Sequence, residues 1–319
     1  MDQHENFSQH PWWIILNPVA GNGLAAKKRP EIEQLLQKYE FEYHLVETTA
    51  KEQAYQLVEE GIKAGYRYIM GIGGDGTNNE VVNGMLKQKL IPPMELIYTL
   101  IPLGTGNDWI KQHRIPSNWK KWIPKIATAK VISHDAGLLQ YSQNGKTKER
   151  YFVNVAGLAY DAFVTSRKVE GSATFLPQVY YLWQVVACLF QYDLRKANIR
   201  FNNKVITNRF YTINIGICKY SGGGMQLVPH ADPQSGELAL TIAGPVSKAA
   251  ILLHVPLIFL GKLHRHPQVN IYKTKEIEIT AVGDEATLVE VDGEFLGETP
   301  VKCVIVEKAF RTLSLNLHN

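Results

Sequence analysis

Three glycine-rich turns, each preceded by a short apolar run, constrain the fold of this chain more than any other feature. The turns occupy 17–23, 73–77 and 104–108, after the apolar runs 12–16, 66–72 and 96–101. Each turn leads into a stretch with helical spacing, so strands and helices alternate. This alternation predicts βαβ units and a parallel sheet, in which all strands end at the same edge. We therefore expect the three turns to gather in one crevice.

The central turn places a single carboxylate, Asp75, among three glycines. We predict that a helix begins at Thr77, with Glu80 completing a capping box. Such a junction presents backbone N–H groups and the positive end of a helix dipole, for which phosphate is the usual ligand. A carboxylate at this place is unfavourable unless a cation lies between it and the phosphates. We interpret Asp75 as a Mg²⁺ ligand, the alternative being an ordinary Asp-Gly turn. The Gly-Lys-Ser/Thr signature of a P-loop is absent.

The length of 319 residues suits two domains. The net charge of +4 is too small to indicate nucleic acid, but it suits an anionic membrane surface or phosphates. Three widely spaced cysteines and the lack of a signal-peptide pattern predict a cytoplasmic protein, with peripheral attachment to the inner membrane surface as a further expectation. No apolar run reaches the ~18–20 residues needed to span a bilayer. The nearest, 249–260 and 175–192, are predicted to be helices buried on one side.

The second part of the chain alternates with a period of two, which predicts strands. Asn144-Gly145 and Asn202-Asn203 are expected at hairpin turns. We predict an α/β nucleotide domain over 1–130 and an antiparallel β-sandwich domain with one helical insertion over 131–309. The predicted strands are 138–142, 151–155, 197–201, 209–217, 237–242, 276–280, 288–291 and 301–306.

Four segments together resemble the diacylglycerol kinase catalytic-domain family, which comprises bacterial lipid kinases related to sphingosine and ceramide kinases. They are NPVAGNG from Asn17, GGDGTNNEV from Gly73, PLGTGND from Pro102 and VDGEFLG from Val291. The GGDGT turn alone also occurs in NAD kinases and phosphofructokinases. The resemblance implies an α/β domain and a β-rich domain with ATP between them, and a C-terminal segment, 310–319, that returns to the first domain.

The resemblance also implies roles for individual residues, with ATP and Mg²⁺ as cofactors. Asn17, Thr48 and Thr105 match nucleotide contacts, although each suits a local cap or turn equally well. Asp108 would be a second acidic group near the metal, its alternative role being a helix cap. The expected nucleotide-binding residues are Asn17, Gly21, Thr48, Gly73, Gly74, Asp75, Gly76, Thr77, Glu80, Gly104, Thr105 and Gly106.

In the second domain, Glu294 matches the glutamate that accepts the proton of the lipid hydroxyl in the family, although the Asp-Gly-Glu segment also reads as a hairpin turn. Asp161 and Asp135 are weaker candidates for substrate contacts or for bracing the domain interface. Ser235 stands where many family members carry an aspartate that holds a structural Mg²⁺. A hydroxyl is a poor Mg²⁺ ligand, so we predict no second metal there.

These features favour a membrane-surface lipid kinase that transfers the γ-phosphoryl group of ATP to diacylglycerol or a related lipid. Its expected partners are ATP and the lipid, without nucleic acid, and a homodimer is left open. One alternative is an enzyme similar to NAD kinases, which share the GGDGT turn. The other is a non-catalytic sensor of nucleotide or lipid, against which the acidic set Asp75, Asp108 and Glu294 argues.

Overall fold

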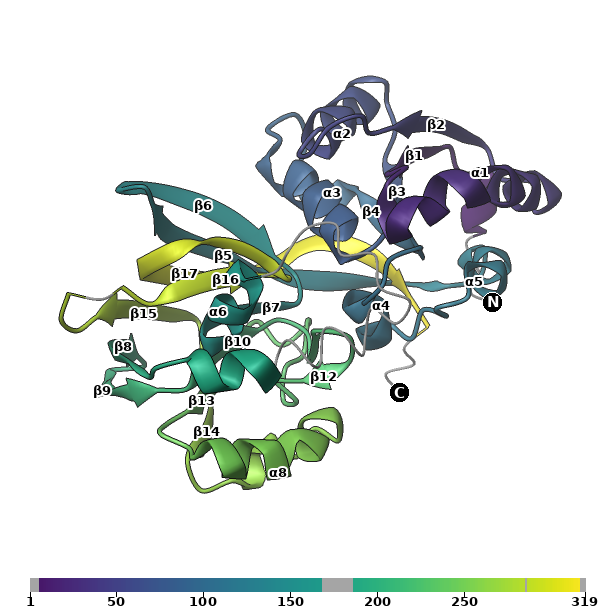
Figure 1. Ribbon diagram of the computed structural model, residues 1–319. Coiled ribbons are helices and arrows are strands. Elements are labelled where there is room, and N and C mark those ends of the chain that lie inside the picture. The colour runs from purple at the N-terminus through teal and green to yellow at the C-terminus, as the bar shows by residue number, and fades with distance from the viewer. Residues whose placement is uncertain (1–5, 168–185, 285, 316–319) are drawn as a thin grey trace. The chain divides into compact units, whose positions relative to one another are not determined.

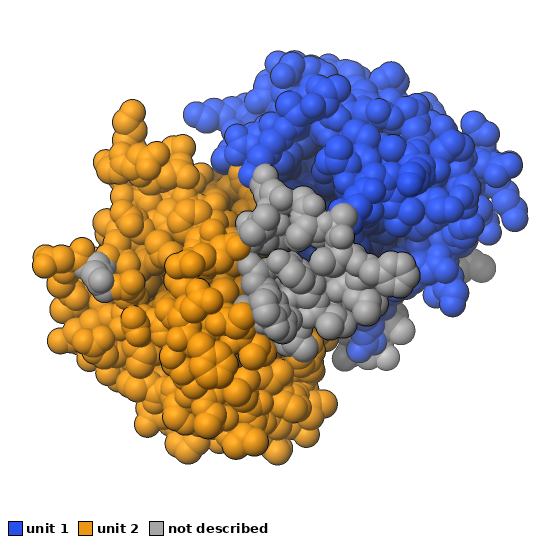
Figure 2. Space-filling view, viewed as in Figure 1, with its two compact units in different colours: residues 1–134, 308–319 blue, residues 135–307 orange. Residues whose placement is uncertain are grey.

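The computed structural model describes residues 6–167, 186–284 and 286–315. The chain forms two compact units, coloured separately in Figure 2. Unit 1 comprises residues 1–134 and 308–319, and unit 2 comprises residues 135–307. Two strands, β5 (Lys130–Gln143) and β17 (Glu294–Ser314), contribute residues to both units. The assignment of nucleotide and lipid binding to separate domains stays a prediction.

Unit 1 is an α/β unit with a parallel sheet, as predicted (Figure 1). The strands lie in the order β2-β1-β3-β4, and the last part of β17 pairs in parallel with β4. Strand β1 is buried along its whole length, as its apolar sequence requires. The elements are η1 (Phe7–Gln9), β1 (Trp12–Leu16), α1 (Ala20–Lys38), β2 (Tyr43–Glu47), α2 (Ala54–Lys63), β3 (Tyr68–Gly73), α3 (Asp75–Lys87), η2 (Pro93–Glu95), β4 (Ile97–Pro102), α4 (Asp108–Gln112) and α5 (Trp119–Ile126).

The predicted capping box at the start of α3 is wrong. The helix begins at Asp75, its N-cap is the extended residue Gly74, and no side chain caps it. Thr77 therefore lies inside the first turn, where its hydroxyl accepts a hydrogen bond from the side chain of Asn17. Because Thr77 is not the cap, Glu80 lies in the second turn of α3 and not three residues after the cap. The glycine rather than the threonine makes the change from strand to helix.

Unit 2 is built from antiparallel strands, as predicted. One path of paired strands runs β14-β13-β10-β7-β16-β17, and β17 also pairs with β15 and β5. Its other elements are β6 (Lys146–Phe152), β7 (Val155–Ala159), α6 (Tyr160–Ser166), β8 (Arg195–Phe201), β9 (Lys204–Phe210), β10 (Thr212–Gly216), β11 (Tyr220–Ser221), β12 (Met225–Gln226), β13 (Leu238–Ala243), α8 (Lys248–Phe259), η3 (Leu263–Arg265), β14 (Val269–Thr274), β15 (Glu276–Ala281) and β16 (Leu288–Val291).

Two predicted strands of unit 2 are each divided in the structure. The run 151–155 is split between β6 and β7, and the run 209–217 is split between β9 and β10. In both cases the residues on either side of the break are buried. No exposed segment marks the point at which the chain changes partner strand. Periodicity alone therefore could not locate these breaks.

The predicted hairpin turns are confirmed. Asn144 and Gly145 connect β5 to β6 with φ values of 52° and 71°, and Asn202 and Asn203 connect β8 to β9 with φ values of 44° and 59°. Two successive residues with positive φ are typical of the turn that matches the twist of a two-residue hairpin.

Helix α8 was predicted to be buried on one side, and its burial is only partial. Ile251 and Ile258 pack against the core of unit 2 and are half-buried, while none of the residues of the helix is fully buried. The other predicted helix, 175–192, lies largely outside the described residues. Its described part is helical from 186 to 191.

Candidate functional site

The ends of three parallel strands in unit 1 bring the predicted turns together. Asn17 follows β1 and bonds through its side chain to the Thr77 hydroxyl at 3.0 Å, while its backbone N–H donates to the carbonyl of Ile72 in β3. Thr48 follows β2, and its N–H donates to the carbonyl of Leu16. These bonds lie at the carboxyl edge of the sheet, where ligands of open α/β sheets bind.

Glycine is required at two of these turns by close backbone approach. A Cβ atom on Gly74 would lie 2.8 Å from the Cα of Gly104, and a Cβ on Gly21 would lie 2.3 Å from the carbonyl oxygen of Leu103. Gly21 also has a φ of 60°, which L-residues with side chains rarely adopt. The turns therefore contact one another through their backbones.

Asp75 has a structural contact that the sequence did not reveal. Its Oδ1 accepts hydrogen bonds from the backbone N–H groups of Asp108 at 2.8 Å and Trp109 at 3.3 Å. Those two groups are the first of α4, so Asp75 caps a helix that lies 33 residues further along the chain. The carboxylate thus ties the second glycine turn to the third.

The remaining oxygen of Asp75 converges with that of Asp108 near Gly106. A Cβ atom placed on Gly106 would lie 2.9 Å from Asp75 Oδ2 and 3.7 Å from Asp108 Oδ2. Two carboxylate oxygens around a residue without a side chain are suitable donors for a hard cation such as Mg²⁺. Asp108 is buried, and its Oδ1 also accepts from the ammonium group of Lys111 at 2.6 Å. Its negative charge is therefore already partly compensated.

The other predicted nucleotide contacts differ in exposure. Gly76 and Thr105 are exposed, and a Cβ on Gly76 would meet no atom within 4 Å. Thr48 and Thr77 are buried, and Glu80 is half-buried on α3. The exposed positions leave room for a ligand above the turns, and the role of each residue in binding nucleotide stays a prediction.

Glu294 begins β17 directly after a tight turn. Asp292 and Gly293 form this turn with φ values of 49° and 84°. Oε2 of Glu294 lies 3.0 Å from Nη2 of Arg150, a residue of β6 that is only 5 % exposed. The ion pair fixes one carboxylate oxygen of Glu294, and Arg150 is a partner that the sequence analysis missed.

Asp292 braces the turn that carries Glu294. Its carboxylate accepts backbone hydrogen bonds from Val153, Asn154 and Val155 at 3.0–3.2 Å, and its own N–H donates to the carbonyl of Val155. The Asp-Gly segment is therefore more than a turn signal, because the aspartate also fills the break between β6 and β7. No sequence pattern predicts a cap between residues so far apart in the chain.

A second acidic pair, Asp161 and Glu290, lies within unit 2. Asp161 is in α6 and accepts a short hydrogen bond from the hydroxyl of Thr212, and Glu290 in β16 is 3 % exposed. A Cβ on Gly157 would lie 2.5 Å from Glu290 Oε1 and 2.9 Å from the Cβ of Asp161, so both side chains cover this glycine. Burial raises the pKa of Glu290 well above its usual value, and the neighbouring Asp161 raises it further.

Glu290 connects this pair to the turn before Glu294, since its Oε2 accepts from the N–H of Gly293 at 2.8 Å. Burial also raises the pKa of Asp161, against the effect of its hydrogen bonds from Thr212 and Asn214. Glu290 was overlooked because it alternates with Val289 and Val291, as a solvent-facing residue of a strand would. Both faces of β16 are buried at this point.

Replacing Glu290 with glutamine should change the pH dependence of stability. The unfolded chain ionises a glutamate above pH ~4.3, whereas burial raises the pKa of Glu290 in the folded protein, so the stability it contributes is lost as the pH rises toward the folded pKa. The free energy of unfolding of Glu290→Gln should therefore exceed that of the native protein increasingly above this pH, by up to ~1.4 kcal/mol per pH unit. Urea unfolding at pH 5 and pH 8 measures this difference.

The exposed Glu276 provides the control for this experiment, since Glu276→Gln makes the same change of side chain without the buried environment. A pH-independent difference between Glu290→Gln and the native protein would contradict the prediction.

Asp135 and Ser235 meet in one loop of unit 2. Asp135 is buried, its Oδ2 accepts from the N–H of Gly236 at 2.7 Å, and its own N–H donates to the carbonyl of Pro233. The hydroxyl of Ser235 donates to the carbonyl of Asp232 at 2.9 Å. Both residues therefore take part in the hydrogen bonds of this loop, and the predicted role of Asp135 toward the substrate or the domain interface stays a prediction.

An apolar cavity of about 110 Å³ lies beneath α8 in unit 2. Side chains of α6, β10, β13 and α8 line it, together with Val186 and Leu189. Asp161 and Thr212, which bond to each other, are among its few polar lining residues. A mostly apolar space with a polar group in its wall is the usual form of a small-molecule site.

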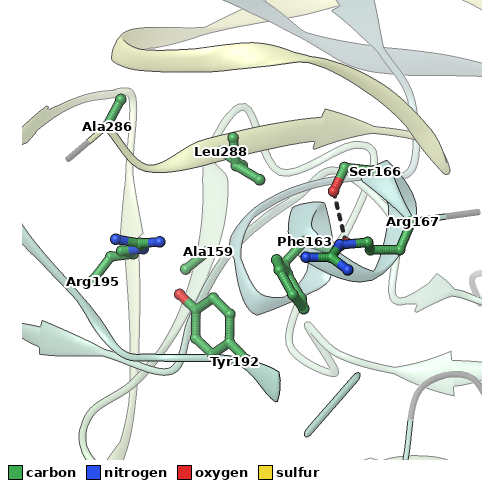
Figure 3. Close-up of a pocket in the computed structure, with 8 residues that line it drawn as sticks. All are labelled: Ala159, Phe163, Ser166, Arg167, Tyr192, Arg195, Ala286 and Leu288. Carbon is green, nitrogen blue, oxygen red and sulfur yellow. Dashed lines mark hydrogen bonds between the residues drawn. The ribbon is translucent and has the colours of Figure 1, made fainter. Parts of the chain in front are cut away.

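A second space, of about 240 Å³, carries cationic side chains. Figure 3 shows Arg195 and Arg167 to either side of Tyr192. Arg167 lies over the ring of Phe163 at 4.8 Å, and the hydroxyl of Ser166 donates to the carbonyl of Phe163 at 2.8 Å. Two guanidinium groups give this space a positive character.

Comparison with known proteins identifies both halves of the chain. Residues 11–139 match the diacylglycerol kinase catalytic domain, and residues 154–314 match the YegS C-terminal NAD kinase beta sandwich-like domain. The chain therefore belongs to the diacylglycerol kinase catalytic-domain family, with the two-domain fold that was predicted.

Individual proteins are similar to this chain in sequence or in fold. A diacylglycerol kinase of Staphylococcus haemolyticus is 28% identical over 292 residues, which cover 90% of this chain and 83% of the relative. The crystal structure of a putative diacylglycerol kinase from Bacillus anthracis has a TM-score of 0.75 at 21% identity, covering 96% of this chain and 97% of that one. A yeast NADH kinase complexed with NADH has a TM-score of 0.53 at 11% identity, over 96% of this chain and 84% of that one.

The helices give no indication of a membrane span. Among the described residues, none is both long enough and apolar enough to cross a bilayer.

Proposed function

We propose that this chain is an ATP-dependent lipid kinase that phosphorylates the hydroxyl group of diacylglycerol or a related lipid. The observation that carries the proposal is the gathering of three glycine turns around Asp75 in unit 1, with Asp108 alongside. Membership of the diacylglycerol kinase catalytic-domain family supports it.

In this proposal the backbone N–H groups of the three turns bind the phosphates of ATP. Asp75 and Asp108 hold the metal through the oxygens that converge near Gly106. When bound, Mg²⁺ supplies positive charge that compensates the phosphates during transfer. The capping bonds from Asp108 and Trp109 to Asp75 keep its carboxylate in one orientation, so that little reorganisation is needed.

Glu294 is the proposed base. The lipid oxygen forms a bond to the γ-phosphorus, the bond between this phosphorus and the leaving oxygen of ADP breaks, and Glu294 accepts the hydroxyl proton. In phosphoryl transfer such a group mainly orients the nucleophile. Arg150, Asp292 and Glu290 hold Glu294 and its turn in place.

The apolar cavity beneath α8 is the proposed place for an acyl chain of the lipid. Its lining is mostly aliphatic and aromatic, and the bonded pair of Asp161 and Thr212 offers polar atoms to a glycerol or ester group. Asp161 therefore serves either as a contact to the substrate or, through Thr212, as a brace between α6 and β10.

The fold similarity to a yeast NADH kinase keeps one alternative, a kinase that acts on a pyridine dinucleotide. In that case the purified protein would convert NAD or NADH to its phosphorylated form with ATP. The sensor hypothesis predicts binding of ATP without transfer to any acceptor.

One assay separates the three functions. The purified protein is incubated with Mg·ATP and mixed detergent micelles that contain diacylglycerol, monoacylglycerol, ceramide or sphingosine, and in parallel with NAD and NADH. We expect a phosphorylated lipid whose formation stops when EDTA is added. Phosphorylation of the dinucleotide alone, or bound ATP without any product, would reject the lipid kinase.

A further inference from the structure

Apart from Lys248 at its first position and His254, helix α8 is apolar on all sides, and yet none of its residues is fully buried. Its inward side chains, among them Ile251, Val255 and Ile258, line the cavity of unit 2. The opposite side carries a second apolar stripe at helical spacing. We call this stripe the outer face of α8, and it consists of Ala249, Leu252, Leu253, Pro256, Phe259 and the adjoining Leu260. Leu252 lies at its edge and also lines the cavity.

The outer face exposes large side chains to solvent. Leu253 is 78% exposed, Leu260 is 60% exposed and Phe259 is 42% exposed. Helices that are apolar on all sides normally lie in a protein core or in a membrane. A group of exposed apolar side chains marks an interaction site, whereas single ones are ordinary.

The neighbourhood of α8 extends this surface. Figure 1 shows the helix at the outer margin of unit 2, beside β13 and β14. Phe190, which is 61% exposed, lies near the start of the helix, where Lys248 Nζ donates to its carbonyl and approaches its ring at 5.8 Å. An aromatic ring next to a lysine is typical of surfaces that lie at a membrane interface.

The charged residues around α8 indicate what kind of partner the outer face binds. The sequence from Leu238 to Lys275 contains no aspartate or glutamate. Within it, Lys248, Lys262 and Arg265 lie at the two ends of α8 and just beyond it. An apolar stripe with positive charge at its ends and no acidic residue complements an anionic lipid bilayer.

We propose that the outer face of α8 inserts into the headgroup region of an anionic bilayer, with Lys248, Lys262 and Arg265 contacting the headgroups. The 12 residues of α8 extend ~18 Å, too short to span the bilayer, so the helix lies along its surface. This inference rests on the proposed function in one respect, namely that the substrate is a membrane lipid. The cavity that accepts the acyl chain would then open beneath the inserted helix.

The test is co-sedimentation of the full chain with vesicles of phosphatidylglycerol and phosphatidylcholine. The variant Leu253→Ser/Leu260→Ser removes two exposed side chains that do not line the cavity, and it should lower the partition coefficient ~100-fold. Lys262→Gln/Arg265→Gln should lower it ~30-fold on anionic vesicles and leave it unchanged on pure phosphatidylcholine. The matched control Val205→Ser/Ile271→Ser changes two exposed apolar side chains of β9 and β14 and should bind as the native protein does.

Two outcomes would overturn the inference. One is vesicle binding by Leu253→Ser/Leu260→Ser that equals the native protein. The other is a native dimer, seen by light scattering, that this variant converts to a monomer, together with no vesicle binding by either. The second result would assign the outer face to another copy of the chain.

Activity in detergent micelles separates this inference from the proposed function. If only the kinase proposal fails, the native protein binds vesicles through α8 but phosphorylates no lipid. If only the docking proposal fails, lipid is phosphorylated and the α8 variant binds vesicles as the native protein does. Equal thermal unfolding temperatures of the native protein and Leu253→Ser/Leu260→Ser will show that the variant is folded.

Discussion

Replacing Asp75 with asparagine is expected to lower kcat for lipid phosphorylation by ~10³-fold or more while unit 1 remains folded. The amide oxygen can still accept the two N–H bonds at the start of α4. The negative charge that would hold the metal near Gly106 is lost, and a bound metal contributes several kcal/mol to stabilising the transition state. Initial rates at increasing Mg²⁺ concentration measure the effect.

The variant Asp75→Ala provides the comparison. Alanine removes the charge and the cap together, so it should be as inactive as Asp75→Asn and also less stable by ~1 kcal/mol. Thermal unfolding distinguishes the two variants. If Asp75→Asn keeps at least a tenth of the native activity and only Asp75→Ala loses it, Asp75 acts as a helix cap and the metal site is wrong.

The parallel sheet of unit 1 could be predicted because its signals are local. Each buried strand is a continuous apolar run, and each is followed by glycines at positions where the structure tolerates no side chain, as at Gly74 and Gly21. The gathering of the turns then follows from the geometry of parallel strands. Hairpin turns such as Asn144-Gly145 are equally local, since they depend on two residues with positive φ.

The contacts that shape the candidate site could not be predicted, because they join distant segments. Asp75 caps α4, Asp292 fills a break between strands about 138 residues away, and Arg150 pairs with Glu294 across 144 positions. Glu290 has the spacing of a surface residue and is buried only because both faces of β16 are covered. The sequence therefore predicts candidate residues for the chemistry but does not reveal which residues hold them in place.

The incomplete burial of α8 has a different physical origin. Its apolar sequence was read as evidence of burial, since apolar surface normally leaves water when a chain folds. The same driving force is satisfied when a helix contacts a lipid surface instead of a core. An apolar sequence indicates that a helix is stabilised by an apolar environment, but it does not distinguish a protein core from a lipid surface. The two faces of this helix therefore look alike in the sequence.

Replacing Glu294 with glutamine should lower kcat by ~10²–10⁴-fold, with little change in the KM for ATP. Glutamine retains an oxygen that accepts from Arg150 but cannot take the proton of a lipid hydroxyl. Steady-state kinetics measures kcat and the KM for ATP.

Stability must be separated from catalysis in this experiment, because Glu294 neutralises a buried guanidinium. Removing the charge of one partner in a buried ion pair is costly, and part of the lost activity could come from a disturbed turn. Glu298→Gln, four residues further along β17, changes a half-buried carboxylate on the same strand and should keep native kinetics. If Glu294→Gln loses activity only in proportion to its unfolded fraction, Glu294 is a structural partner of Arg150, and the proton must be accepted elsewhere.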